Sequence, residues 1–207
     1  MHRYTTPFIG LLFCASAFAA EEWKDDSNNK GVLIQSRAHL GTSLLEFRAV
    51  GTVDAPTRRV FAVLDDTAAY PSFMPYVASA RLLKREENAV VVYQRLDLPL
   101  VQDRDYTLRT RFEKAQTDAG PVYRMRWTPV NELGPAASRG VVRVNECEGG
   151  WLLEPLSESS TRATYTIFTD SGGALPAFLE NSGSRIAIRK LFEAIRKQVH
   201  AAKYATE

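Results

Sequence analysis

Residues 171–200 decide the fold, and they read SGGALPAFLENSGSRIAIRKLFEAIRKQVH. Two glycines break the preceding pattern, Pro176 suits the first position of a helix, and basic residues near the end complement a helix C-terminus. At about 100° per residue, the second half has one apolar face, formed by Ile188, Leu191, Phe192, Ile195 and Val199. The stretch therefore predicts a long C-terminal helix whose second half is anchored in a core.

The first half of this predicted helix has a different pattern. Its continuation of the same face carries only small and polar residues, namely Ala177, Asn181 and Ser184. Leu179 and Ile186 point the opposite way, so the first half resembles a lid over a cavity. The alternative is a kink near Gly183, which costs only about 1 kcal/mol in a helix and would turn both apolar stripes toward one core. The pattern leaves both alternatives open.

Length and composition are those of one globular domain. The chain has 207 residues, of which 45% are hydrophobic and 24% charged, enough for a sizeable core. The formal net charge is +2 and the basic residues are spread along the chain, so we expect no nucleic-acid partner. We expect a monomer.

The first twenty residues differ in kind from the rest. His2 and Arg3 precede an apolar run over 7–13, and small residues follow, ending at Ala19. This layout is typical of a secretory signal peptide, so we predict a signal over 1–19, a single domain over 20–207, and a periplasmic or secreted protein. Retention of the segment as a membrane anchor is the alternative.

The two cysteines are divided by the predicted cleavage site. Cleavage removes Cys14 and leaves Cys147 as a single thiol, so no internal disulfide is expected. Cys147 ends a strand pattern, which favours a packed residue over a reactive one.

Between these two ends the hydrophobic period is mostly two. We predict strands over 31–38 and 44–53, a helix opened by residues 54–56, and seven further strands over 77–85, 89–98, 105–113, 122–130, 140–147, 151–156 and 162–169. Turn signals separate the later strands, among them Gly149-Gly150. The short connections predict an antiparallel meander.

One face of this predicted sheet is rich in large apolar groups. Alternation in two strands places on that face Tyr106, Leu108, Tyr123, Met125 and Trp127. Tyr165 and Ile167 are ambiguous, because Phe168 has the opposite parity. A strongly curved sheet wrapped around the C-terminal helix would bury the apolar face. The alternative is a filled core without a cavity, as in a protein-binding module.

Six segments carry a resemblance to a known family. They are EFRA at 46–49, VDAP at 53–56, YPSFMPY at 70–76, DRDY at 103–106, WLLEP at 151–155 and PAFLEN at 176–181. In this order, within strand–strand–helix–strands–helix, they resemble the helix-grip fold and its bacterial secreted START lipid-transfer domains. The resemblance implies an α+β fold in which a curved antiparallel sheet wraps around a long C-terminal helix. It also implies a tunnel that holds one lipid or other apolar small molecule. We expect no cofactor.

The pattern and the resemblance together name candidate site residues. We expect ligand contacts from Tyr106, Leu108, Tyr123, Met125, Trp127, Tyr165, Ile167, Ala177, Asn181, Ser184, Arg185 and Ile188. The resemblance implies a gate, for which the candidates are Leu98, Pro99, Gly172, Gly173 and Phe178. An outer apolar patch at Leu179 and Ile186 would contact a membrane surface transiently.

Arg104 and Asp105 form the most prominent charged neighbours. Strand geometry points their side chains to opposite faces, so they are not expected to pair with each other. We expect one of them to tie the gate loop to a neighbouring strand. Headgroup binding is the alternative.

Catalysis has little support in the sequence. It contains no G-x-S-x-G, H-E-x-x-H or phosphate-loop motif, so we predict no catalytic residue and no metal site. The prediction is a non-catalytic lipid-binding protein with a pocket of roughly 300–1,000 Å³. The alternative is a polyketide-cyclase-like enzyme of the same fold acting on a hydrophobic substrate. Two converging titratable groups in the cavity would favour the enzyme, and an apolar lining would favour the carrier.

Overall fold

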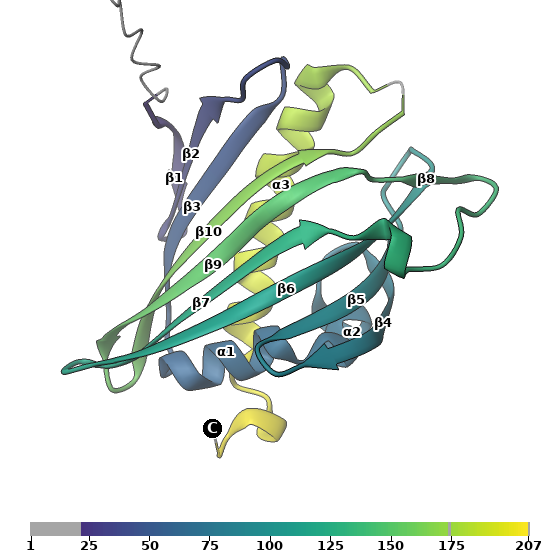
Figure 1. Ribbon diagram of the computed structural model, residues 1–207. Helices are drawn as coiled ribbons and strands as arrows, with labels where there is room; N and C mark the ends of the chain where they lie inside the picture. Colours follow the sequence, from purple (N-terminus) through teal and green to yellow (C-terminus); the bar gives the residue numbers. More distant parts are fainter. Residues whose placement is uncertain (1–21, 174, 207) are drawn as a thin grey trace, which may run out of the picture.

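The structure is a computed structural model that describes residues 22–173 and 175–206. The segment 1–19 lies outside the described residues, so the signal peptide stays a prediction. The fold is α+β, with a large antiparallel sheet and a long C-terminal helix (Figure 1). This confirms the predicted fold class.

The strands of the described chain form one ten-stranded sheet. They are β1 (Lys24–Asn29), β2 (Val32–Ala38), β3 (Leu45–Val53), β4 (Val77–Glu86), β5 (Ala89–Leu96), β6 (Asp103–Thr117), β7 (Gly120–Pro129), β8 (Val141–Arg143), β9 (Glu146–Ser157) and β10 (Ser160–Asp170). Their order is β1-β2-β3-β10-β9-β7-β6-β5-β4, with β8 paired to β6. The helical elements are α1 (Thr57–Asp65), η1 (Thr67–Ala69), α2 (Tyr70–Phe73), η2 (Asn131–Leu133), α3 (Ala177–Gln198) and η3 (Ala202–Tyr204).

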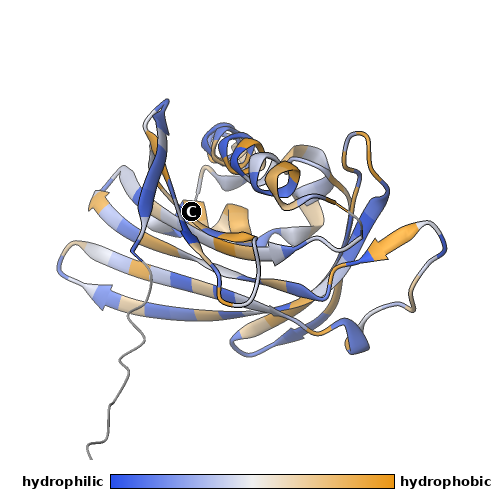
Figure 2. Ribbon diagram, turned by 90° about the horizontal axis from the view of Figure 1, so that it is seen from above, coloured by the Kyte–Doolittle hydropathy of each residue, from blue (hydrophilic) through white to orange (hydrophobic). Residues whose placement is uncertain are grey.

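The sheet curves around α3, which lies on its concave side (Figures 1 and 2). The second half of α3 is anchored there by Ile188, Phe192 and Ile195, and Val199 just beyond the helix is buried with them. A Cβ atom on Gly51 would lie 2.8 Å from the Phe192 ring, so helix and sheet are in close contact at this point. The predicted apolar face is therefore confirmed as the anchor of the helix.

The first half of α3 does not turn its apolar residues inward. Leu179 is 50% exposed and Ile186 is 49% exposed. The alternative prediction, a kink that brings both apolar stripes of the helix into one core, is therefore wrong for this chain.

Among the described residues, no helix is long and apolar enough to span a membrane.

The two strands predicted over 140–147 and 151–156 are wrong in their bounds. Gly149 and Gly150 form no turn and lie inside the continuous strand β9. A Cβ atom at Gly149 would lie 2.2 Å from the Thr166 carbonyl oxygen, and one at Gly150 would lie 2.5 Å from that of Met125. These glycines allow close backbone approach within a curved sheet, which is the other common role of glycine in strands.

Two further features depart from the predicted meander. Strand β8 pairs with β6 in parallel, Asp103 opposite Val141, because residues 130–140 return along the sheet before β8 begins. Strand β1 was not predicted, because it is polar and mostly exposed. Polar contacts to α3 hold it, with Arg185 Nε 2.7 Å from Asp26 Oδ2 and Arg189 donating to Ser27 Oγ at 3.0 Å.

Candidate functional site: a cavity beneath the C-terminal helix

A cavity of about 280 Å³ lies between the concave face of the sheet and α3. The sheet supplies side chains from β5, β6, β7, β9 and β10, the segment from α1 to β4 closes one side, and α3 covers the cavity. The contributions of α3 are Ser184, Ala187, Ile188 and Leu191. The volume falls just below the range predicted from the sequence.

Most residues predicted to contact a ligand line this cavity. They are Tyr106, Leu108, Met125, Trp127, Tyr165, Ile167, Ser184 and Ile188. They come from three strands and one helix on both sides of the cavity, so the fold brings together residues that are far apart in the sequence. The sequence left open which face of the sheet carries Tyr165 and Ile167, and the structure places both side chains in the cavity lining.

Four of the predicted contact residues lie elsewhere. Tyr123 stacks on Phe61 of α1, with ring centroids 4.5 Å apart, because α1 covers that end of the sheet. The other three sit on the first turns of α3, away from the cavity lining: Ala177, Asn181 and Arg185.

The start of α3 faces the β2–β3 turn and the edge strand β1, which explains these positions. Asn181 Oδ1 accepts a hydrogen bond from the Leu45 N–H at 3.0 Å, and Arg185 pairs with Asp26. Their side chains hold the helix in place, and the part of α3 that covers the cavity begins at Ser184.

Several lining residues were missed by the sequence reasoning. Strand β5 contributes Val90, Val92, Gln94 and Leu96, and the segment before β4 contributes Tyr70, Met74 and Tyr76. Periodicity did not mark the inner face of β5, because its first four residues are all apolar and all buried. The segment 70–76 lies in a short helix and a connection, so no periodicity marked its inner face.

The titratable side chains in the lining are phenols and one thiol: Tyr70, Tyr76, Tyr106, Tyr165 and Cys147. Burial raises the pKa of Tyr106 and Tyr165 well above the ordinary range of a phenol. Burial also raises the pKa of the Cys147 thiol to about 11, against smaller opposite effects from Thr169 and Trp127. Tyr106, Tyr165 and Cys147 are therefore neutral near pH 7. The described lining contains no carboxylate, imidazole, ammonium or guanidinium group.

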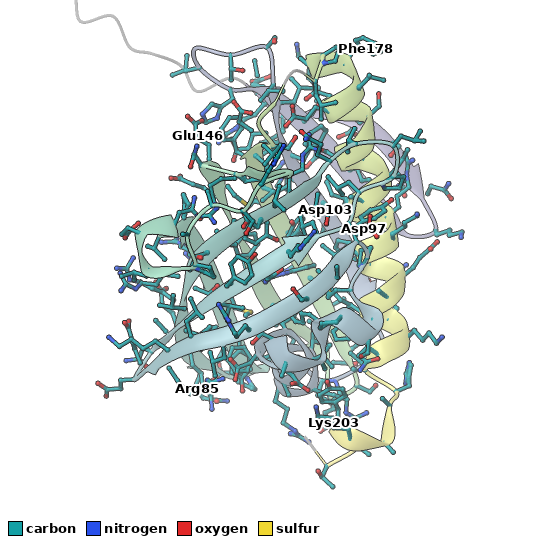
Figure 3. All side chains as sticks on the ribbon, turned by 90° about the vertical axis from the view of Figure 1, so that its right-hand side faces the viewer. Arg85, Asp97, Asp103, Glu146, Phe178 and Lys203 are labelled. Atoms are coloured by element: carbon teal, nitrogen blue, oxygen red, sulfur yellow. The ribbon has the colours of Figure 1, made fainter. Side chains whose placement is uncertain are left out.

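The predicted gate residues divide into two groups. Leu98 lines the cavity, whereas Pro99, Gly172, Gly173 and Phe178 do not. Gly172 and Gly173 have φ of 67° and 80°, a conformation that favours glycine, and a Cβ atom on Gly172 would lie 3.0 Å from Val142. Phe178 is exposed at the free end of α3, far from Arg85 and Lys203 at the opposite end of the molecule (Figure 3).

Arg104 connects the two predicted gate segments, which we call the gate loops: residues 97–102 and residues 171–173. Its buried guanidinium donates to the Gln102 carbonyl oxygen in one loop and, at 3.4 Å, to that of Gly172 in the other. Arg104 therefore ties both loops to the start of β6.

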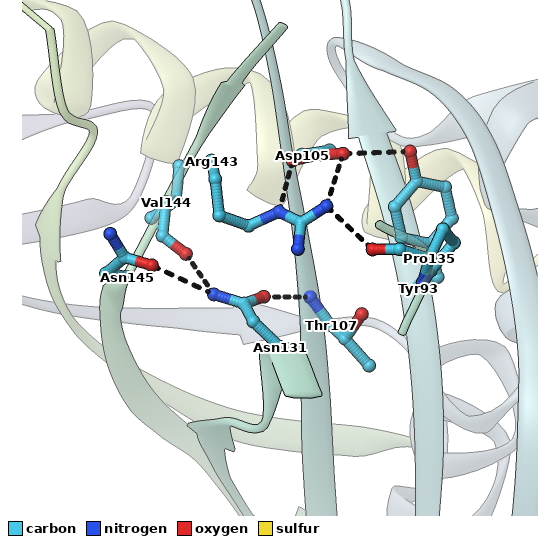
Figure 4. A network of polar contacts seen from close by, with 8 residues as sticks. All are labelled: Tyr93, Asp105, Thr107, Asn131, Pro135, Arg143, Val144 and Asn145. Carbon is cyan, nitrogen blue, oxygen red and sulfur yellow. Dashed lines mark hydrogen bonds and ion pairs between the residues drawn. The ribbon is translucent and has the colours of Figure 1, made fainter. Parts of the chain in front are cut away.

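Asp105 faces the opposite side of the sheet, as strand geometry predicted. Its carboxylate accepts two hydrogen bonds from Arg143, at 2.6 and 3.0 Å, and one from the Tyr93 hydroxyl at 3.1 Å (Figure 4). In the same network Asn131 accepts from the Thr107 N–H and donates to the Val144 carbonyl oxygen. These bonds fix residues 130–145 to the outer face of β6.

Comparison with known proteins agrees with this geometry. A crystal structure of a STAR-related lipid transfer protein from Xanthomonas axonopodis is similar, with a TM-score of 0.77, 28% identity, and coverage of 86% of this chain and 98% of that one. Human STARD10 shares the fold at a TM-score of 0.77 and 19% identity, over 87% of this chain and 74% of that one.

Two comparisons rest on sequence. An uncharacterized protein of Pseudomonas aeruginosa is 27% identical over 181 residues, which cover 87% of this chain and 88% of that protein. The model of the family described as "Polyketide cyclase / dehydrase and lipid transport" matches residues 53–196. Since this match spans more than half of the chain, the protein belongs to the polyketide cyclase/dehydrase and lipid transport family, within the START superfamily.

Proposed function

We propose that the protein binds one apolar small molecule, a lipid or a similar hydrophobic compound, in the cavity beneath α3. The observation that carries this proposal is the uncharged, largely apolar lining of a cavity of about 280 Å³. Small-molecule sites in proteins are typically of this kind, with a few polar groups set among apolar and aromatic side chains. Each Å² of apolar ligand surface removed from water contributes about 25 cal/mol to binding.

Carriage of the ligand, rather than its conversion, is the function the lining supports better. General acid–base catalysis is most effective when a group has a pKa near the working pH. Burial moves the pKa values of Tyr106, Tyr165 and Cys147 away from that range. The similarity to the Xanthomonas lipid transfer protein also favours a carrier.

The second candidate is a polyketide-cyclase-like activity, which the family description includes. One observation favours it: Tyr106, Tyr165 and Cys147 line the same cavity, and the titration of Tyr106 is influenced by both other groups. A substrate held there would contact several proton-bearing side chains. This candidate predicts a chemical change in the bound molecule, which a carrier does not produce.

Transfer would require contact with a membrane near the gate loops. Leu100, Phe178, Leu179 and Ile186 are large apolar residues on the surface of the loop before β6 and of the first half of α3. We propose that they touch the bilayer during ligand exchange, as amphipathic surfaces do. Export with cleavage after Ala19 remains part of the proposal, and N-terminal sequencing of the mature protein tests it. An intact Met1 on membrane-bound material would contradict it.

The proposed function is tested by native mass spectrometry of residues 20–207, followed by organic extraction of the released ligand. We expect one apolar molecule per chain, recovered unchanged. A ligand-free protein that takes up nothing from a mixed panel of lipids would contradict the binding proposal. A recovered product that differs from the supplied molecule, and that Tyr165→Phe abolishes, would favour the cyclase-like candidate.

A further inference from the structure

The cavity contains one buried amide that the protein leaves half satisfied. Gln94 on β5 is 8% exposed and lies directly opposite Tyr106 on β6. Both side chains line the cavity, and the Tyr106 hydroxyl donates to Gln94 Oε1 at 3.1 Å. The Gln94 amide nitrogen makes no hydrogen bond with any residue that the structure describes.

An amide that has a partner at only one end gains a hydrogen bond when a ligand supplies the second partner. Whichever way the amide is turned, Tyr106 occupies one end and the other end faces the cavity without a partner. If the Gln94 carbonyl oxygen faces Tyr106, the free amide N–H requires an acceptor from the ligand. If the amide is turned the other way, the free carbonyl oxygen requires a donor, and the Tyr106 O–H requires an acceptor. A hydroxyl group satisfies both arrangements, because it donates and accepts.

The charge of the ligand follows from the rest of the lining. The described cavity residues include no cation that could pair with a buried carboxylate or phosphate. Arg104 lies two residues before Tyr106 on β6, opposite Leu96 on β5. Its guanidinium is outside the lining and donates to the carbonyl oxygens of the gate loops. An anion in this cavity would therefore be desolvated without compensation. Burial raises the pKa of the Tyr106 phenol, so this group too stays uncharged.

We propose that Gln94 and Tyr106 form a recognition site for a hydroxyl group on a neutral, otherwise apolar ligand. This inference rests on the proposed function and specifies its ligand class: an uncharged alcohol rather than a fatty acid or a phosphorylated lipid. The ligand hydroxyl completes the hydrogen bonding of the Gln94 amide. It thereby fixes one end of the ligand beside Gln94 and Tyr106. The remaining apolar part of the ligand extends beneath α3.

The test uses three probes of equal chain length: 1-decanol, decane and decanoate at pH 8. Their affinities for residues 20–207 are measured by displacement of the neutral dye Nile red. Gln94→Leu removes the amide while keeping a side chain of similar size, so we expect about threefold to tenfold weaker binding of decanol. Decane should bind the variant at least as tightly as the wild type, which shows that the cavity is intact. Decanoate should bind the wild type about tenfold or more weakly than decanol.

Gln116→Leu is the matched control, because it makes the same substitution at an exposed residue of β6 that lies outside the cavity lining. It should leave the ratio of the decanol and decane affinities unchanged. Three results would overturn the alcohol assignment and leave the proposed function standing. They are equal losses for decanol and decane in Gln94→Leu, an equal loss for decanol in Gln116→Leu, and binding of decanoate as tight as that of decanol. Failure of all three probes and of Nile red to bind the wild type would overturn both.

Discussion

Asp105 and Arg143 form a bidentate ion pair, with the Arg143 Nε and Nη2 atoms 2.6 and 3.0 Å from the two carboxylate oxygens. The Asp105 residue is 1% exposed, and Arg143 also donates to the Pro135 carbonyl oxygen at 3.0 Å. The pair thus holds residues 130–145 against the outer face of β6. Arg104, the preceding residue, ties the gate loops on the inner face, so the start of β6 is fixed from both sides.

Asp105→Asn should destabilise the protein by about 3–5 kcal/mol, because it leaves Arg143 without its counter-charge in a mostly buried position. Urea denaturation measures the change. The matched control is Asp103→Asn, which breaks the more exposed pair that Asp103 forms with Arg95 at 2.6 Å. The control should cost about 0–1 kcal/mol. If both variants lose a similar amount of unfolding free energy, the Asp105–Arg143 pair does not stabilise the fold more than an exposed ion pair does.

Leu179→Asp should slow ligand transfer between vesicles yet change stability by no more than about 0.5 kcal/mol, because this side chain is half exposed. Transfer rates between donor and acceptor vesicles, recorded beside thermal melts, check both parts. Ile195→Ala, in the buried anchor of α3, should instead lower stability by about 2–5 kcal/mol. If Leu179→Asp unfolds the domain, the assignment of an outer membrane-contacting face is wrong.

Gly183→Ala should raise the free energy of unfolding by about 0.5–1 kcal/mol, because alanine loses less backbone entropy in a helix. A Cβ atom at this position meets nothing within 4 Å, so no clash offsets the gain. Chemical denaturation of the variant beside the wild type provides the measurement. A destabilised variant would indicate that this turn of α3 needs the conformational freedom of glycine.

Cys147 should react slowly with a disulfide reagent such as Ellman's reagent at pH 8. The thiolate is the reactive form, and burial raises the pKa of this thiol to about 11. Reaction of the native protein should be far slower than reaction in urea, and a bound ligand should slow it further, since Cys147 lines the cavity. Native labelling as fast as that of the unfolded chain would contradict the buried position.

Much of the fold could be predicted, because it depends on periodicity. The 3.6-residue stripe that ends in Ile195 and Val199 located the anchor of α3, and the alternation around Met125 located the dry face of the sheet. These patterns reflect burial against one surface. Burial is the property that hydrophobic periodicity records.

The predicted elements were wrong where something other than apolar burial determines the structure. Gly149 and Gly150 are typical of a turn in sequence, but they lie in β9. Glycine is needed there because neighbouring carbonyl groups leave no room for a side chain. Strand β1 is held by polar contacts such as Asp26 with Arg185, which produce no apolar period. The parallel pairing of β8 depends on a network around Asp105 that joins residues distant in sequence.

The site was predictable in part for the same reason. Residues on the alternating face, such as Tyr106 and Trp127, line the cavity, and so does Ser184. Asn181 does not, because the first turns of α3 lie over the β2–β3 turn, and a sequence pattern does not specify where along its length a helix leaves the sheet. Gln94 was missed because a polar residue on an inward parity is evident only once its strand pairing is known.

Binding of Nile red to Ala187→Trp and to Ala177→Trp tests the central claim, an occupiable cavity beneath α3, most directly. Ala187 lines the cavity, whereas Ala177, ten residues earlier on the same helix, does not. The wild type and Ala177→Trp should each bind one dye molecule per chain with equal affinity. Ala187→Trp should bind none and remain folded, because the indole enters open space instead of a close-packed core, where it would cost about 1–3 kcal/mol. Undiminished binding by Ala187→Trp, or its loss in Ala177→Trp alone, would contradict the location of the site.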